Sequence, residues 1–106
     1  MDTAFFQQHT MNNKKLQEEM IEIFSRQIPV YLKEMKEALN TQDITLWKKV
    51  HHTIRGTALD MGFSQLSNLA FQAENSQNLC HTLAKEIEDS LITSRDKAWR
   101  FLENSN

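Results

Sequence analysis

The sequence predicts an all-α protein, an antiparallel up-down four-helix bundle with a short N-terminal helix or extension. The 106 residues include only two glycines and one proline, whereas sheets and their hairpins usually need more turn residues. Apolar residues recur every three or four positions over long stretches, which is the period of a helix with one buried face. Short polar links join these stretches, as expected for helices that pack against their chain neighbours.

Length and composition narrow the class of protein. Apolar residues make up 40% and charged residues 25%, which is typical of a globular chain. We expect one domain over residues 1–106, with 1–12 as an N-terminal extension and 13–106 as the bundle. A net charge of −2 without a basic stripe argues against nucleic-acid binding. Without a signal peptide or an apolar run near the ~20 residues of a membrane span, we expect a cytoplasmic protein.

The first helix pattern follows a weakly patterned start. Phe5 and Phe6 can anchor a short helix or turn against the body of the domain. Asn12 or Asn13 can cap the next helix, since an Asx side chain accepts hydrogen bonds from unpaired backbone donors. The pattern then runs over about 14–39 and comprises Leu16, Met20, Ile23, Phe24, Ile28, Tyr31, Leu32, Met35 and Leu39.

One proline interrupts this first pattern. Pro29 lacks a backbone donor and crowds the preceding turn, so we expect a kink or a break near 26–28. The polar link 40–43 follows, and Asp43 is a suitable N-cap for a helix over about 44–61. Gly62 should end that helix, because glycine adopts the left-handed conformation without steric cost.

Two further helices complete the prediction. Ser64 is expected to cap a helix with the apolar residues Leu66, Leu69, Ala70 and Ala73. The polar run 75–78 should end it. The last helix is expected to begin near 79–83 and to reach about 103, with an inner side formed by Leu83, Ile87, Leu91, Ala98, Phe101 and Leu102.

His52 is predicted to lie on the outside of the helix over 44–61. At about 100° per residue, its bulky apolar residues cluster within about 60° of one another, namely Trp47, Val50, Ile54 and Met61. His52 lies nearly opposite that cluster. Gly56, one turn later, has no side chain to cover it, although glycine inside a helix costs roughly 1 kcal/mol relative to alanine. The pattern therefore suggests a steric reason for this glycine.

An exposed imidazole with this surrounding is suited to carrying a phosphoryl group. Imidazole has an ordinary pKa of about 6.5, and its neutral nitrogen can attack phosphorus. Lys48, Lys49 and Arg55 lie three or four residues away, on the same helix surface, where they can offset phosphate charge. Leu59 lies within about 20° of His52 on the helical wheel. It is expected to be either a docking contact or a residue that the N-terminal segment covers. The alternative is a solvated histidine among solvated lysines.

The other histidines are expected to have packing or surface roles. His51 lies at the edge of the apolar face and is predicted to be a half-buried packing residue. His51 and His52 point about 100° apart, so they cannot clamp one metal ion. His9 and His81 have no partner at ligand spacing, and Cys80 is predicted to be a small core residue. We therefore expect no metal site and no cofactor.

The residues around His52 resemble a known family. The sequence shows His52-Thr-Ile-Arg-Gly56, then Gly62, then Leu66-x-x-Leu-Ala70 and Glu74. This set is similar to the His-x-(Leu/Ile)-Lys-Gly motif, second glycine and Leu-x-x-Leu-Ala helix of the histidine-containing phosphotransfer (HPt) domain of multistep phosphorelays. The resemblance covers about residues 16–74. It departs at Arg55, where the family has lysine.

The resemblance implies a phosphocarrier without its own kinase or ATP site. His52 would accept a phosphoryl group from a receiver-domain phospho-aspartate and pass it to another receiver's aspartate. The receivers would belong to a hybrid sensor kinase and a response regulator, and Mg²⁺ would be held by the receiver. Glu74 would orient the histidine ring, or else is a solvated glutamate. By the same analogy the protein would be a monomer without membrane contact.

Alternatives remain open from the sequence alone. The chain can be the phosphotransfer segment of a larger histidine kinase of the chemotaxis type, or a helical adaptor that is not phosphorylated. A helical metalloenzyme would need an inward Glu-x-x-His pair, which the sequence lacks. Phe71 lies off the apolar stripe of its helix and is either part of a docking patch or buried under another helix.

Overall fold

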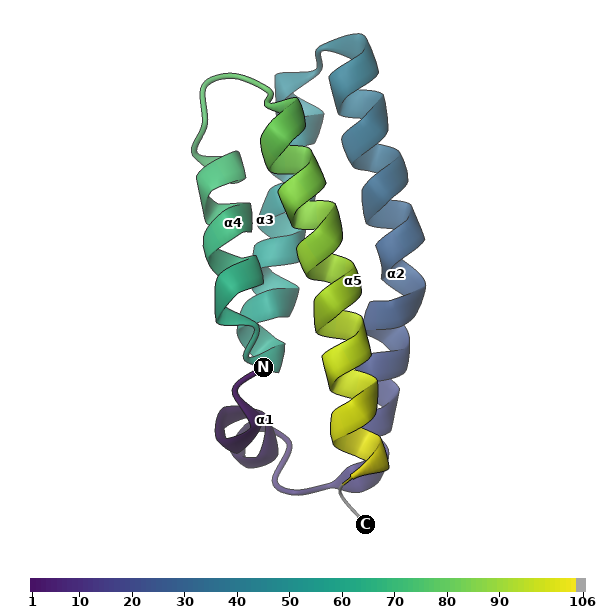
Figure 1. Cartoon of the computed structure of the whole chain (residues 1–106). Helices are drawn as coiled ribbons and strands as arrows, with labels where there is room; N and C mark the ends of the chain where they lie inside the picture. The colour runs from purple at the N-terminus through teal and green to yellow at the C-terminus, as the bar shows by residue number, and fades with distance from the viewer. Residues whose placement is uncertain (105–106) are drawn as a thin grey trace.

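The fold is that of a helical bundle, seen in a computed structural model that describes residues 1–104. The last two residues of the predicted bundle lie outside this part. The chain forms five helices there, in the order α1 (Thr3–His9), α2 (Lys14–Thr41), α3 (Ile44–Met61), α4 (Ser64–Glu74) and α5 (His81–Glu103). The four longer helices lie alongside one another, and the chain reverses direction at each link between them (Figure 1). The all-helical prediction is therefore confirmed.

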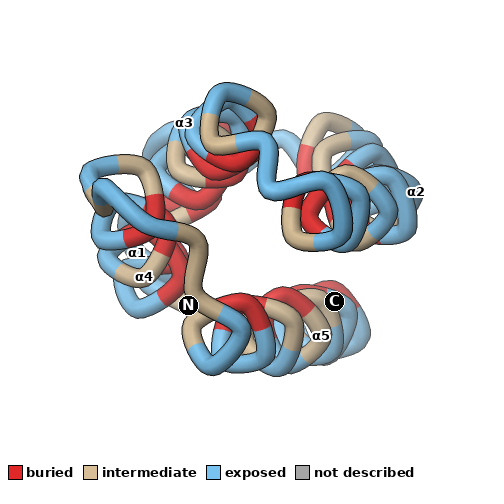
Figure 2. The backbone as a smooth tube through the Cα atoms, turned by 90° about the horizontal axis from the view of Figure 1, so that it is seen from above, coloured by how far each residue is buried: buried red, intermediate tan, exposed pale blue. Residues whose placement is uncertain are grey.

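The core lies between the four longer helices. Their buried residues face the inside of the bundle, whereas the exposed residues lie on its outer side (Figure 2). Helix α3 packs against both α2 and α4, and α5 closes the bundle against α2 and α4. Trp47 and Ile54 on α3 are fully buried. Burial of apolar side chains such as these provides most of the stability of the helices.

The short helix α1 is anchored at the end of the bundle (Figure 1). Phe6 is fully buried and meets the Phe101 ring edge to face at 5.7 Å between centroids. The Asp2 backbone N–H donates to the Gly62 carbonyl at 2.8 Å. Gly62 has a φ of 74°, and a Cβ there would approach the Asp2 backbone oxygen to 3.0 Å. Glycine is thus required at the α3–α4 turn both by conformation and by contact.

The predicted helix starts are confirmed at two of three positions. The side chains of Asn13 and Asp43 accept hydrogen bonds from backbone N–H groups in the first turns of α2 and α3. The prediction for Ser64 is wrong, because Phe63 occupies the N-cap position of α4 and makes no side-chain cap. Phe63 is instead buried in the core, so apolar burial takes the place of a capping hydrogen bond.

Helix α2 differs from its prediction at two points. Of the kink or break expected near 26–28, the break does not occur, because the helix is continuous through Pro29. Phe24 and Tyr31 are buried on either side of the proline and hold both halves in the bundle. Ile23, predicted to face inward, is 51% exposed, whereas Ile21 is fully buried. The face of α2 that is buried in the bundle is therefore rotated slightly around the helix axis relative to the apolar stripe predicted from residue spacing.

The start of α5 also corrects one expectation. Cys80 is only partly buried, and its Sγ accepts a hydrogen bond from the Leu83 backbone N–H at 3.4 Å, so it serves as the N-cap of α5 rather than as a core residue.

Among the helices of residues 1–104, none combines the length and the apolar character that a membrane span requires.

Candidate functional site

The site is centred on His52, on the outer surface of α3. Its side chain is 73% exposed, as the helical wheel predicts. Its ring Nδ1 lies 2.6 Å from Oε1 of Glu74, which is the last residue of α4. The two residues are 22 positions apart in the chain, so only the packing of α4 on α3 brings them together.

The contact with Glu74 determines which nitrogen of His52 is available. A carboxylate can only accept a hydrogen bond, so Nδ1 carries the proton and donates it. Within the described residues, no hydrogen bond engages Nε2. The neutral ring therefore presents an unprotonated Nε2 with a free lone pair to solvent. This is the form of imidazole that can act as a nucleophile.

A buried tryptophan holds the glutamate in place from behind. The Trp47 indole N–H donates to the Ala73 carbonyl at 3.0 Å, and both residues are fully buried. Ala73 directly precedes Glu74, so this bond joins the end of α4 to the first half of α3. The sequence indicated Trp47 as core filler but carried no signal for this bond.

Arg55 lies beside Glu74 rather than free on the surface. Its Nη1 is 3.5 Å from Oε2 of Glu74, and its guanidinium carbon lies 4.7 Å from the centroid of the Phe71 ring. Oε2 is buried and accepts no hydrogen bond from residues 1–104. The 3.5 Å approach is an ion pair that is too long for a good hydrogen bond. The ring contact was missed in the sequence, although Phe71 and Glu74 are three residues apart on α4, a spacing that places them on one surface.

The surface beside His52 is open. A Cβ built on Gly56 would meet no atom within 4 Å, so nothing in the bundle itself requires glycine there. Leu59 is 52% exposed and Phe71 48% exposed, which rules out burial of Phe71 under another helix and covering of Leu59 by the N-terminal segment. Lys48 and Lys49 are exposed, and neither pairs with a carboxylate in the described part of the chain.

His51 differs from its prediction, because it is fully buried rather than half-buried. Helix α3 packs against both α2 and α4, and contact with two neighbours buries a wider face than the apolar stripe. Nδ1 of His51 lies 2.7 Å from the Trp47 carbonyl, and Nε2 is buried without a hydrogen-bond partner among the described residues. Burial lowers the pKa of His51 below its ordinary value of 6.5, against smaller raising effects of the Trp47 carbonyl and of the Glu74 charge.

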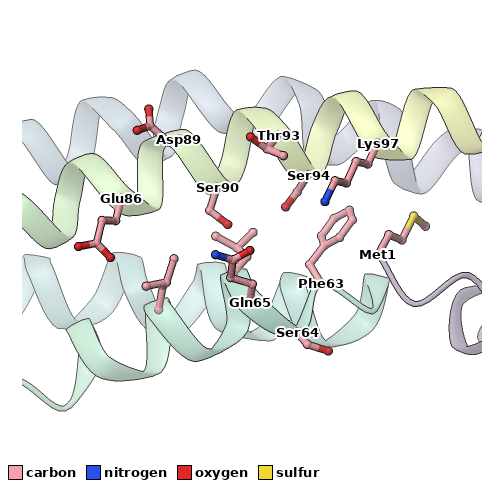
Figure 3. A pocket seen from close by; sticks show the side chains of 12 residues that line it. Met1, Phe63, Ser64, Gln65, Glu86, Asp89, Ser90, Thr93, Ser94 and Lys97 are labelled. Atoms are coloured by element: carbon pink, nitrogen blue, oxygen red, sulfur yellow. The ribbon is translucent and has the colours of Figure 1, made fainter.

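The hollow between α4 and α5 lies apart from the predicted site. It is lined largely by polar side chains, among them Gln65, Ser90 and Lys97 (Figure 3). None of the residues predicted around His52 lines it. Across residues 1–104, no three histidine, cysteine or acidic side chains are grouped closely enough to hold a metal ion.

Comparison with known families shows the family to which the chain belongs. The profile of the Hpt domain matches residues 19–98, a span that includes α3 and α4. The chain belongs to the Hpt domain family. Hpt domains are phosphocarriers of two-component systems, not kinases, and they interact with receiver domains of response regulators. No curated protein and no solved structure matches this Hpt domain significantly.

Proposed function

We propose that this Hpt domain is a phosphorelay carrier in which His52 is the phosphoacceptor. It takes the phosphoryl group from the phospho-aspartate of one receiver domain, in a hybrid sensor kinase, and passes it to the aspartate of a second receiver in a response regulator. The observation that carries this proposal is the exposed imidazole whose Nδ1 donates to Glu74 at 2.6 Å, which leaves Nε2 as the nucleophile.

The chemistry follows from this tautomer. The Nε2 lone pair attacks phosphorus, the new N–P bond forms, and the acyl P–O bond breaks to release the receiver's aspartate as a carboxylate. No proton needs to leave Nε2. The ring becomes positively charged as the bond forms, because Nδ1 keeps its proton, and the Glu74 carboxylate stabilises that charge at 2.6 Å. Transfer to the second receiver reverses these steps, and Mg²⁺ belongs to the receiver.

The surroundings of His52 supply access and charge. Gly56 leaves clearance for the receiver's active site, since no atom lies within 4 Å of a Cβ there. Leu59 and Phe71 are exposed apolar residues that support docking of the receiver. Lys48 and Lys49 are free to approach the phosphoryl oxygens, whereas Arg55 shares its charge with Glu74 through Nη1.

The proposed setting of the carrier follows the same reading. We propose a cytoplasmic monomer, built as an antiparallel four-helix bundle that begins at residue 13, with α1 in the N-terminal extension. The open face around His52 needs no second copy to form the site. A phosphotransfer segment of a larger histidine kinase would use the same residues, and an adaptor would use the docking face alone.

A transfer experiment tests the proposal. The full chain is incubated with purified receiver domains that carry radiolabelled acyl phosphate, and acid-labile, base-stable label on the chain is followed. We expect label on the wild-type chain and none on His52→Gln. Equal labelling of the variant would overturn the site, and an absence of label from every receiver, with binding retained, would identify an adaptor.

A further inference from the structure

Four side chains form a connected row across α3 and α4, and the family motif accounts for only part of it. The Arg55 guanidinium rests 4.7 Å from the centroid of the Phe71 ring. Its Nη1 lies 3.5 Å from Oε2 of Glu74, and Oε1 of the same carboxylate accepts from Nδ1 of His52 at 2.6 Å. The row thus runs from an aromatic ring, through a cation and a carboxylate, to the nucleophile.

The second carboxylate oxygen of Glu74, Oε2, explains why a cation is needed here. Oε2 is buried and accepts no hydrogen bond from the described residues, and a buried carboxylate oxygen without compensation is unfavourable. Nη1 of Arg55 is the cationic atom in ion-pair range of that oxygen. If Arg55 left, solvation would favour rotation of the carboxylate toward water, and this rotation would weaken the bond to His52.

Phe71 restrains the Arg55 side chain in addition to the ion pair with Glu74. The Arg55 side chain is 36% exposed and contacts Glu74 through one long ion pair, so the pair alone does not define a single rotamer. The face of an aromatic ring attracts a planar guanidinium and limits its orientation. A lysine at position 55 would still be attracted to the ring, but its ammonium group has no plane that the ring could orient.

We propose that Phe71 is a positioning residue, which sets the tautomer of His52 through Arg55 and Glu74 in addition to any contact with a partner. The consequence for phosphoryl transfer rests on the proposed function. The effect on the imidazole does not, because it is a property of the chain alone. Phe71 acts on the reacting nitrogen through Arg55 and Glu74 and does not contact His52 directly in this chain of interactions.

The first experiment measures the tautomer of His52 without any partner. Nitrogen-15 NMR of the full chain at alkaline pH, where imidazole is neutral, gives the ratio of the Nδ1–H to the Nε2–H form. We expect Phe71→Leu to lower this ratio about twofold to fivefold, as the loss of an exposed cation–π contact predicts. Phe71→Tyr keeps a ring and should keep the ratio. An unchanged ratio in Phe71→Leu would overturn the proposal.

The second experiment separates positioning from docking. Phosphoramidate is a small donor with no docking surface; its P–N bond breaks and ammonia leaves as the bond from Nε2 to phosphorus forms. We expect Phe71→Leu and Arg55→Lys to slow this labelling about twofold to fivefold each, and the double variant to be no slower than the slower single one. Normal labelling of Phe71→Leu by phosphoramidate, with slower labelling from a receiver, would show a docking role only and overturn the proposal.

The two proposals fail in different ways. If no receiver labels the chain but Phe71→Leu still shifts the tautomer ratio, the positioning role stands and the relay role falls. If receivers label the chain and the ratio does not respond, the opposite holds. Thermal unfolding of each variant shows whether the bundle is intact, and we expect it to be so, because Phe71 is 48% exposed.

Discussion

His51 and His52 are adjacent residues of identical chemistry, and α3 places them in opposite environments. His51 is fully buried against Trp47, with 4.2 Å between ring centroids, whereas the His52 side chain is 73% exposed. Both rings use Nδ1 as a donor: His51 donates to the Trp47 carbonyl one turn back, and His52 donates to the Glu74 carboxylate of α4. Both therefore carry an unprotonated Nε2.

The difference between the two lone pairs is access and charge. Nε2 of His51 lies in the core, where it makes no hydrogen bond with residues 1–104 and no phosphoryl donor can reach it. Nε2 of His52 faces solvent, and its ring has an anionic acceptor that can stabilise positive charge during N–P bond formation. A rotation of about 100° between neighbours on a helix is thus enough to separate a packing residue from a nucleophile. The tautomer alone does not make a phosphoacceptor.

The largest expected effect comes from exchanging each histidine in turn. His52→Gln should remove all phosphoryl transfer, since no other accessible imidazole has the Glu74 acceptor. His51→Gln should retain transfer but lower the free energy of unfolding by about 1–3 kcal/mol, because a buried ring is lost and its site repacks poorly. Labelling assays measure phosphoryl transfer in both variants, and chemical denaturation measures the free energy of unfolding of His51→Gln. Label that disappears in His51→Gln while the bundle stays folded would reverse the assignment.

A second change tests the charge of the acceptor. In Glu74→Gln the amide can either accept from Nδ1 or donate to it, so one tautomer is no longer enforced and the negative charge is gone. We expect phosphoramidate labelling of His52 to slow about tenfold, the value of a charge-assisted hydrogen bond at an exposed site. Glu86→Gln on α5, an exposed glutamate away from the site, removes the same charge and should label normally.

The pH dependence of the free energy of unfolding tests the burial of His51. Burial lowers the pKa of His51 in the folded protein, while the unfolded chain has a histidine pKa of about 6.5. Between the two values the unfolded chain binds more protons, so the free energy of unfolding decreases as pH falls below about 6.5, by at most about 1.4 kcal/mol per pH unit. Above that pH, His51 does not contribute to the change of the free energy of unfolding with pH. Denaturation curves across this range should show the slope in wild type and a reduced slope in His51→Gln; equal slopes would contradict the assignment.

The smallest expected effect concerns clearance beside His52. Gly56→Ala should stabilise α3 by up to about 1 kcal/mol, because alanine is the better helix former and its Cβ meets no atom within 4 Å. Transfer from a receiver should slow about fivefold through crowding at the contact, with phosphoramidate labelling unchanged. A lower melting temperature of Gly56→Ala together with an unaltered rate of transfer from the receiver would contradict the proposed clearance role of Gly56.

Much of the fold could be predicted from local patterns. Apolar spacing places Trp47, Ile54 and Met61 in the core, and Asp43 and Gly62 bound α3 as their backbone preferences require. The same spacing puts His52 outside. The failures arise at the flanks of the apolar stripes: His51 is fully buried and Ile23 is 51% exposed, in helices that each pack against two others of the four longer helices. A single-helix wheel has no information about which neighbours pack on its flanks.

The site divides in the same way. The sequence by itself determined the exposed His52, the bare position at Gly56 and the cations on one helix, because these depend only on rotation along α3. Only the tertiary structure decided that Glu74 accepts from Nδ1, that Arg55 pairs with Glu74 and rests on Phe71, and that Trp47 bonds to the Ala73 carbonyl. Each of these contacts joins α3 to α4 across a separation of 16 to 26 residues, and such contacts follow from how two helices pack rather than from the pattern of either one.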